Sequence, residues 1–196
     1  RIVRPAGSPA PCGGAAPPTA EAPPTDPAAE AQRLAREILI LDTHIDLPYR
    51  LHEHPADVTV ETADGHFDLV RARRGGLDAA FMSIYVPASL QEEGGARAMA
   101  DGLIDLVEGI AAQAPESFAI ARSPAEVRSL FEQRVFALPL RIENGAATED
   151  DLTELAHFHH RGVDGRASPG ALCTSWHMPG QHYVVVHFRG DHSRRR

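Results

Sequence analysis

The chain has 196 residues, a formal net charge of −8 at pH 7 and two cysteines, Cys12 and Cys173. It contains no run of about 18 apolar residues, so a transmembrane segment is not expected. The acidic balance argues against nucleic acid as a main partner, and two cysteines are too few for a disulfide-dependent fold.

The composition divides the chain into three segments. Residues 1–30 are rich in proline and alanine and hold almost no large aliphatic side chain. Such a segment cannot bury enough apolar surface to offset the entropy of ordering, so we expect a disordered linker. Residues 31–163 carry most of the aliphatic periodicity, whereas residues 164–196 carry five Arg against two Asp. This abrupt change predicts that the tail is frameshifted or disordered. The alternative is a genuine, ordered tail.

A proline-rich linker often follows an export signal or a lipid anchor, and Cys12 fits the remnant of such an anchor. We therefore expect an exported, periplasmic or lipid-anchored protein. The alternatives are an incidental cysteine and a cytoplasmic protein.

The middle segment alternates helical and extended patterns. Apolar side chains recur at helical spacing over residues 28–38 and again over 95–112. Short apolar runs predict buried strands at 38–41, 77–86 and 118–121.

Three further signals follow along the chain. Ser123-Pro-Ala-Glu126 matches a capping box with Pro at the first helical position. Residues 135–142 predict a fourth strand, although Pro139 lacks the N–H that a sheet ladder uses. Thr148 is expected to cap a helix that ends at Gly162. Strands alternating with helices predict a parallel α/β sheet or barrel, whose chemistry lies where the strands end.

Metal-type ligands follow two of these predicted strands. His44 and Asp46 are two residues apart, so they project to the same side of an extended segment. An imidazole and a carboxylate that converge in this way suit Zn²⁺. Glu143 directly follows an apolar run, and one carboxylate can bridge two metal ions about 3.5–4 Å apart. On spacing alone, these residues also fit a loop histidine and two solvated acids.

Three ordered blocks of sequence occupy residues 38–51 (ILILDTHIDLPYRL), 65–87, and 138–145 together with 151–163. Together they resemble the membrane dipeptidase family, also called peptidase family M19, over about residues 30–163. The resemblance implies an α/β fold, namely the N-terminal half of a TIM-like (β/α) barrel of the metal-dependent hydrolase type, with about four βα units. It also implies a zinc-dependent metallodipeptidase that hydrolyses dipeptides by metal-activated water.

By this resemblance, His44 and Asp46 bind the first of two Zn²⁺ ions and Glu143 bridges both. The family's remaining ligands and catalytic groups lie beyond Val163, where this sequence departs from the family pattern. We therefore expect a truncated chain with a partial site and low or no activity, and assign no catalytic residue. One alternative is a non-catalytic half-barrel that binds metal or forms a homodimer through open edge strands. Another amidohydrolase-like reaction on the same barrel is a third hypothesis.

The other histidines match no ligand position of the family. They are His52, His54, His66, His157, His159 and His160. The spacing of His157 and His160 would let them share a metal on one helix, but we expect them to be surface residues. The tail histidines recur every five residues, which suits neither one helix face nor one side of a strand; they are His177, His182, His187 and His192.

Overall fold

A computed structural model describes residues 26–143, 145–151, 153–166 and 184–186 of the chain. These residues form one seven-stranded sheet, and every strand pairing in it is parallel. Residues 1–25 of the expected linker, Cys12 and most of the tail with its histidines lie outside the described residues. The last part of the predicted linker is wrong, because residues 27–30 form the first turn of a helix that Asp26 caps. Among the described helices, none has the length and apolar character needed to cross a membrane.

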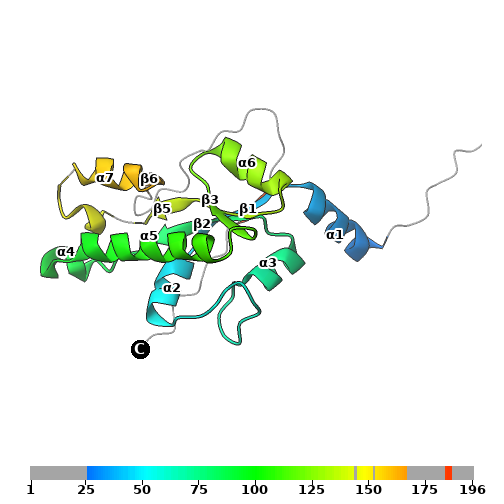
Figure 1. The fold of residues 1–196 in the computed structure, drawn as a ribbon, viewed down its shortest axis with the longest axis horizontal. Coiled ribbons are helices and arrows are strands. Elements are labelled where there is room, and N and C mark those ends of the chain that lie inside the picture. The colour runs from blue at the N-terminus through cyan, green and yellow to red at the C-terminus, as the bar shows by residue number, and fades with distance from the viewer. Residues whose placement is uncertain (1–25, 144, 152, 167–183, 187–196) are drawn as a thin grey trace, which may run out of the picture.

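Helices and strands alternate along the chain, as predicted (Figure 1). The helices are α1 (Pro27–Glu37), α2 (Leu47–Glu53), α3 (Leu69–Gly75), α4 (Ser89–Glu93), α5 (Ala96–Gln113), α6 (Pro124–Glu132) and α7 (Glu154–His160), with a 3-10 turn η1 (Ala146–Thr148). The strands are β1 (Ile40–Ile45), β2 (Ala79–Ile84), β3 (Phe118–Ile120), β4 (Phe136–Leu138), β5 (Leu140–Ile142), β6 (Val163–Arg166) and β7 (Val184–Val186).

The strand order is β3-β4-β2-β1-β7, and β5 pairs with both β2 and β6. Because consecutive βα units place their strands side by side and parallel, the described residues form an open part of a TIM-like barrel. The carboxyl ends of β1, β2 and β5 therefore lie at the same edge of the sheet.

Pro139 divides the predicted strand 135–142 into β4 and β5. Its carbonyl accepts a hydrogen bond of 2.8 Å from the Met82 N–H, so the pairing with β2 continues past it. Proline has no N–H to offer the other neighbour, and the partner on that side changes at this point. β3 pairs with β4, whereas β6 pairs with β5.

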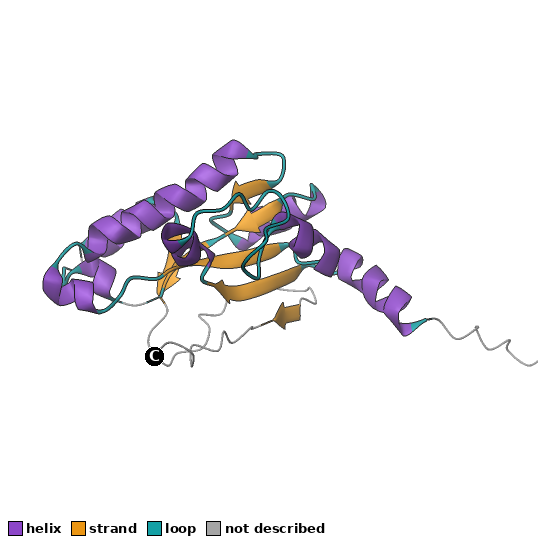
Figure 2. Cartoon of the chain, turned by 90° about the horizontal axis from the view of Figure 1, so that it is seen from below, coloured by secondary structure: helices purple, strands orange, loops and turns teal. Residues whose placement is uncertain are grey.

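Apolar side chains cover both faces of the sheet. One cluster joins β2 and β5 to α2 and α5, and it includes Met82, Ile84, Leu103 and Leu140. A smaller cluster lies on the other face beneath α6 and comprises Leu41, Ala79, Phe81, Ala121, Val127 and Ala137. Figure 2 shows α1 projecting away from the sheet, and none of its residues is buried.

Two predicted boundaries are wrong. The first strand does not end at Leu41 but runs from Ile40 to Ile45, so His44 lies within it. The helix predicted from Thr148 begins at Glu154 instead. The intervening Glu149 and Asp150 adopt φ values of 46° and 63°. A right-handed helix cannot include such left-handed backbone, so it starts only after these residues.

Candidate metal centre

An irregularity in the β1–β2 ladder decides which way His44 points. Asp42 lies opposite Ala80, whereas Ile45 lies opposite Met82, so β1 contains one residue more than β2 between these pairs. Such a bulge re-aims the side chains that follow it. Asp42 and Ile45 thereby face the same side of the sheet, and His44 projects from the other side. The buried Asp42 accepts a hydrogen bond of 2.9 Å from the His44 N–H, which holds the bulge.

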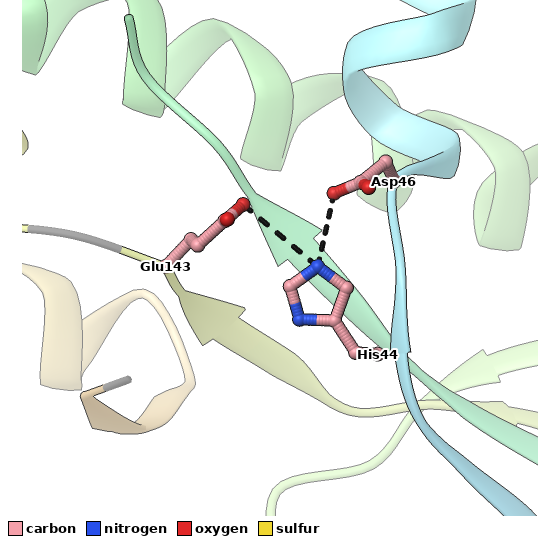
Figure 3. Close-up of side chains that lie close together, drawn as sticks. All are labelled: His44, Asp46 and Glu143. Atoms are coloured by element: carbon pink, nitrogen blue, oxygen red, sulfur yellow. Dashed lines mark hydrogen bonds and ion pairs between the residues drawn. The ribbon is translucent and has the colours of Figure 1, made fainter. Parts of the chain in front are cut away.

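His44, Asp46 and Glu143 converge at the carboxyl ends of β1 and β5 (Figure 3). The Nε2 atom of His44 lies 3.1 Å from Oδ1 of Asp46 and 3.8 Å from Oε2 of Glu143. One nitrogen and two carboxylate oxygens, one from each residue, lie within 4.8 Å of one another. The structure therefore brings together the three residues that the sequence singled out.

Glu143 is held from the neighbouring strand. Its N–H donates to the carbonyl of Ile84 at 3.3 Å, and the hydroxyl of Ser83 donates to its Oε2 at 2.9 Å. Ser83 is buried, so this contact is shielded from water. Sequence reasoning missed Ser83, because only the strand register shows that this serine faces the site.

The pKa of His44 is raised above its ordinary value. The main cause is the hydrogen bond with Asp46, to which the negative charges of Asp46 and Glu143 add. Burial and the positive charge of Arg141 act in the opposite direction. A proton and a metal ion therefore compete for the same imidazole nitrogen.

The donor set fits a divalent metal ion. One imidazole nitrogen and two carboxylates are ligands that Zn²⁺ uses in proteins. The side chains of His44, Asp46 and Glu143 are 25%, 39% and 34% exposed, so an ion can reach them from solvent. In the part of the chain that the structure describes, these residues form the one such group of three or more His, Cys, Asp or Glu side chains.

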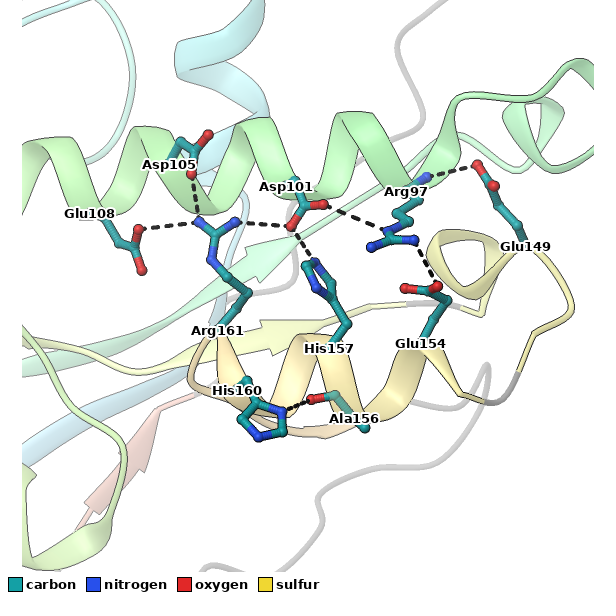
Figure 4. Close-up of polar contacts among 10 residues, drawn as sticks. All are labelled: Arg97, Asp101, Asp105, Glu108, Glu149, Glu154, Ala156, His157, His160 and Arg161. Carbon is teal, nitrogen blue, oxygen red and sulfur yellow. Dashed lines mark hydrogen bonds and ion pairs between the residues drawn. The ribbon is translucent and has the colours of Figure 1, made fainter.

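His157 and His160 of α7 do not form a second metal pair (Figure 4). The Nε2 atom of His157 lies 2.8 Å from Oδ1 of Asp101 on α5. The Nδ1 atom of His160 lies 2.6 Å from the carbonyl oxygen of Ala156 within the same helix. Each ring thus has a local partner. His160 is exposed, as expected, whereas His157 is half-buried.

Comparison with known proteins identifies relatives of this chain. The model of the membrane dipeptidase family (peptidase family M19) matches residues 28–166, which reach the end of β6. The chain is similar to the probable dipeptidase PvdM from Pseudomonas aeruginosa, with 27% identity and a TM-score of 0.62 over 70% of this chain and 36% of that one.

Two further solved structures share this similarity. One is the dipeptidase AC, a metallopeptidase of family M19, with 28% identity and a TM-score of 0.58 over 66% of this chain and 42% of that one. The other is a metallopeptidase from Rhodobacter sphaeroides bound to a phosphinate mimic of the dipeptide L-Ala-D-Ala. Its identity is 25% and its TM-score 0.58, over 66% of this chain and 44% of that one. The chain therefore spans less than half the length of these three structures.

Proposed function

Because the chain belongs to the membrane dipeptidase family (peptidase family M19), we propose that its metal centre serves the hydrolysis of dipeptides. The observation that carries the proposal is the convergence of His44, Asp46 and Glu143 where β1 and β5 end. Barrel enzymes place their chemistry at this edge of the sheet. The fold by itself would not distinguish this reaction from others, so the proposal rests on the ligand set.

We propose Zn²⁺ as the metal, with His44 and Asp46 as ligands of one ion and Glu143 as a bridge to a second. Bound Zn²⁺ would polarise the scissile carbonyl and lower the pKa of the attacking water. The chain's own residues prepare the site: Asp42 fixes the bulge that aims His44, and Ser83 fixes the carboxylate of Glu143.

Dipeptides are supported as the substrate class by the structures that this chain resembles. Two of them are described as dipeptidases, and the Rhodobacter sphaeroides protein binds a mimic of L-Ala-D-Ala. We accordingly propose L-Ala-D-Ala as the first substrate to test.

We also propose that this chain by itself holds a partial site with low or no activity. Among the described residues, its candidate ligands are one imidazole and two carboxylates, one of which would be shared. Two tetrahedral Zn²⁺ ions need more protein ligands than this.

The test measures metal affinity and hydrolysis separately. The purified chain is titrated with Zn²⁺ against a chromophoric chelator, and L-Ala-D-Ala is then added with and without EDTA. His44→Ala is expected to weaken Zn²⁺ binding at least tenfold, about 1.4 kcal/mol. His157→Ala removes a histidine that contacts Asp101 instead, and serves as the control. Unchanged affinity in His44→Ala contradicts the metal centre. Turnover near an ordinary enzyme rate of about 10 s⁻¹ contradicts only the partial site.

The open sheet favours a second function, that of a dimerising metal-binding module. In the described part of the chain, β3 and β7 end the strand order, and an edge strand offers unpaired N–H and C=O groups to another chain. Light scattering over a range of concentrations tests this function. A stable homodimer that binds Zn²⁺ without hydrolysing the dipeptide supports it, and a monomer contradicts it.

A further inference from the structure

Arg141 lies on β5 directly opposite Ser83 of β2. Side chains alternate along a strand, so Arg141 shares a face of the sheet with Glu143, two residues further on. Ser83 also belongs to this face, because its hydroxyl contacts the Glu143 carboxylate. The positive charge of Arg141 opposes the rise in the pKa of His44 that the two carboxylates cause. Arg141 therefore stands beside the candidate metal centre.

The guanidinium of Arg141 has no partner within the described part of the chain. Its Nε atom is buried and makes no hydrogen bond. The carboxylates of the site are already engaged, Asp46 with His44 and Glu143 with both His44 and Ser83. A guanidinium stays charged at all ordinary pH values, and a buried donor without a partner is unfavourable. This arrangement favours an anion supplied by a ligand.

The charge balance of the site also favours an anionic ligand. When His44 is neutral, the two carboxylates of Asp46 and Glu143 offset one divalent ion. Arg141 then adds a positive charge that these residues do not compensate, and a second metal ion would add more. The planar fork of an arginine binds a carboxylate through two parallel N–H bonds, which gives geometry as well as charge.

We propose that Arg141 binds a carboxylate group of the ligand beside this metal centre and so gives the site a preference for anionic ligands. This inference rests on the proposed function and deepens it, because it names the residue that would bind the free carboxylate of a dipeptide beside the metal. The sequence blocks assign Arg141 no role; the strand register and the unpaired guanidinium do.

The test compares two probes that differ in charge at one group, N-acetylalanine and N-acetylalaninamide. Calorimetric titration of the Zn²⁺-loaded chain is expected to give at least tenfold tighter binding of the carboxylate probe. Arg141→Met should reduce this preference to what the metal alone provides, and Arg141→Lys, which keeps the charge but not the fork, should retain more of it. Arg74→Met removes an exposed arginine of α3 and should leave the preference intact.

A second readout separates ligand binding from a structural role. Removing a nearby positive charge should leave the Zn²⁺ affinity of Arg141→Met unchanged or increase it a few-fold. Weaker Zn²⁺ binding in a folded Arg141→Met chain would show that Arg141 supports the fold of the site, and would overturn the proposal. If Arg141→Met does not fold, Arg141→Lys and Arg141→Gln decide by the same measurements.

Zn²⁺ binding and the preference for the carboxylate probe test the proposed function and the role of Arg141 separately. A wild-type chain that does not bind Zn²⁺ overturns both. Zn²⁺ binding together with an equal preference for the carboxylate probe in the wild type and in Arg141→Met overturns the role of Arg141 alone.

Discussion

The hydroxyl of Ser83 donates a hydrogen bond of 2.9 Å to Oε2 of Glu143, across the β2–β5 pairing. The same oxygen lies 3.8 Å from Nε2 of His44. Ser83 is 2% exposed, so water does not compete for this bond. A hydrogen bond of this kind fixes the direction of a carboxylate that is to bind metal.

Replacing Ser83 by alanine is expected to weaken Zn²⁺ binding by about 10–100-fold, because the Glu143 carboxylate loses its fixed orientation. Chelator competition measures the change. Ser117→Ala is the matched control, since Ser117 is also buried but its hydroxyl contacts Glu116 instead. Equal Zn²⁺ affinities of Ser83→Ala and the wild type would show that Ser83 does not position the ligand.

The parts of the site that depend on local pattern were predictable from sequence. His44 and Asp46 follow an apolar run at a spacing of two, and Glu143 follows another, so their convergence at one sheet edge could be expected. Ser83 and Arg141 depend on which residues of two strands lie opposite each other. The sequence of one strand does not determine its register with the other strand. Sequence analysis therefore missed both residues.

The fold shows the same division. Ser123 caps α6 as its motif predicts, through a hydrogen bond of 3.2 Å from the Glu126 N–H to its Oγ. The predicted start of α7 at Thr148 is wrong. Thr148 is a residue type that favours an N-cap, but here it ends a 3-10 turn that left-handed backbone follows. Thr148 and its neighbours in this turn are buried, so tertiary packing overrides the local preference of Thr148 for a helix N-cap.

The carboxyl of Asp78 should make stability depend on pH. Burial raises its pKa from 3.8 to about 6, although the hydrogen bond from the Ile40 N–H and the charge of Arg134 oppose this shift. The folded state therefore holds this proton more tightly than the unfolded state does. The resulting stabilisation is complete below about pH 4 and is lost as the pH rises through about 6.

Asp78→Asn should remove this loss while its side-chain oxygen still accepts from Ile40. Relative to the wild type, the variant should gain about 1–2 kcal/mol between pH 4 and pH 7, after allowance for the partial exposure of the carboxyl. Urea unfolding at several pH values measures the difference. Asp57→Asn, at an exposed aspartate whose pKa is lowered, should not show such a gain. A pH-independent difference between Asp78→Asn and the wild type would refute the assignment.

Asp68 ties the loop after α2 to α3 and is fully buried. It accepts hydrogen bonds from the N–H groups of Thr62 at 3.0 Å and Arg71 at 2.8 Å, and it pairs with the Arg71 guanidinium. Asp68→Ala should lower the free energy of unfolding by about 3 kcal/mol, because these donors lose their partner. Asp57→Ala removes an exposed aspartate with a similar local bond to Thr59 and should cost far less. Similar urea midpoints for the two variants would mean that the Asp68 network contributes little.

Arg161 fastens the segment after α7 to the acidic face of α5 (Figure 4). Its guanidinium contacts three carboxylates there, Asp101 at 3.0 Å, Asp105 at 2.5 Å and Glu108 at 3.2 Å. The Arg161 side chain is 25% exposed, so these charges interact in a less polar setting than an isolated surface pair. The network links the segment between α7 and β6 to α5.

Arg161→Ala should lower the melting temperature by about 3–6 °C at low salt, as expected for a loss of about 1–2 kcal/mol. The difference should shrink in 1 M NaCl, where the Debye length falls to about 3 Å. Arg161→Lys keeps the charge but not the planar guanidinium, so its melting temperature should lie between those of the wild type and Arg161→Ala. Arg74→Ala breaks one exposed pair, with Glu61 at 3.3 Å, and should change the melting temperature little. A salt-independent effect of Arg161→Ala would point to lost packing of the side-chain stem rather than to its charge.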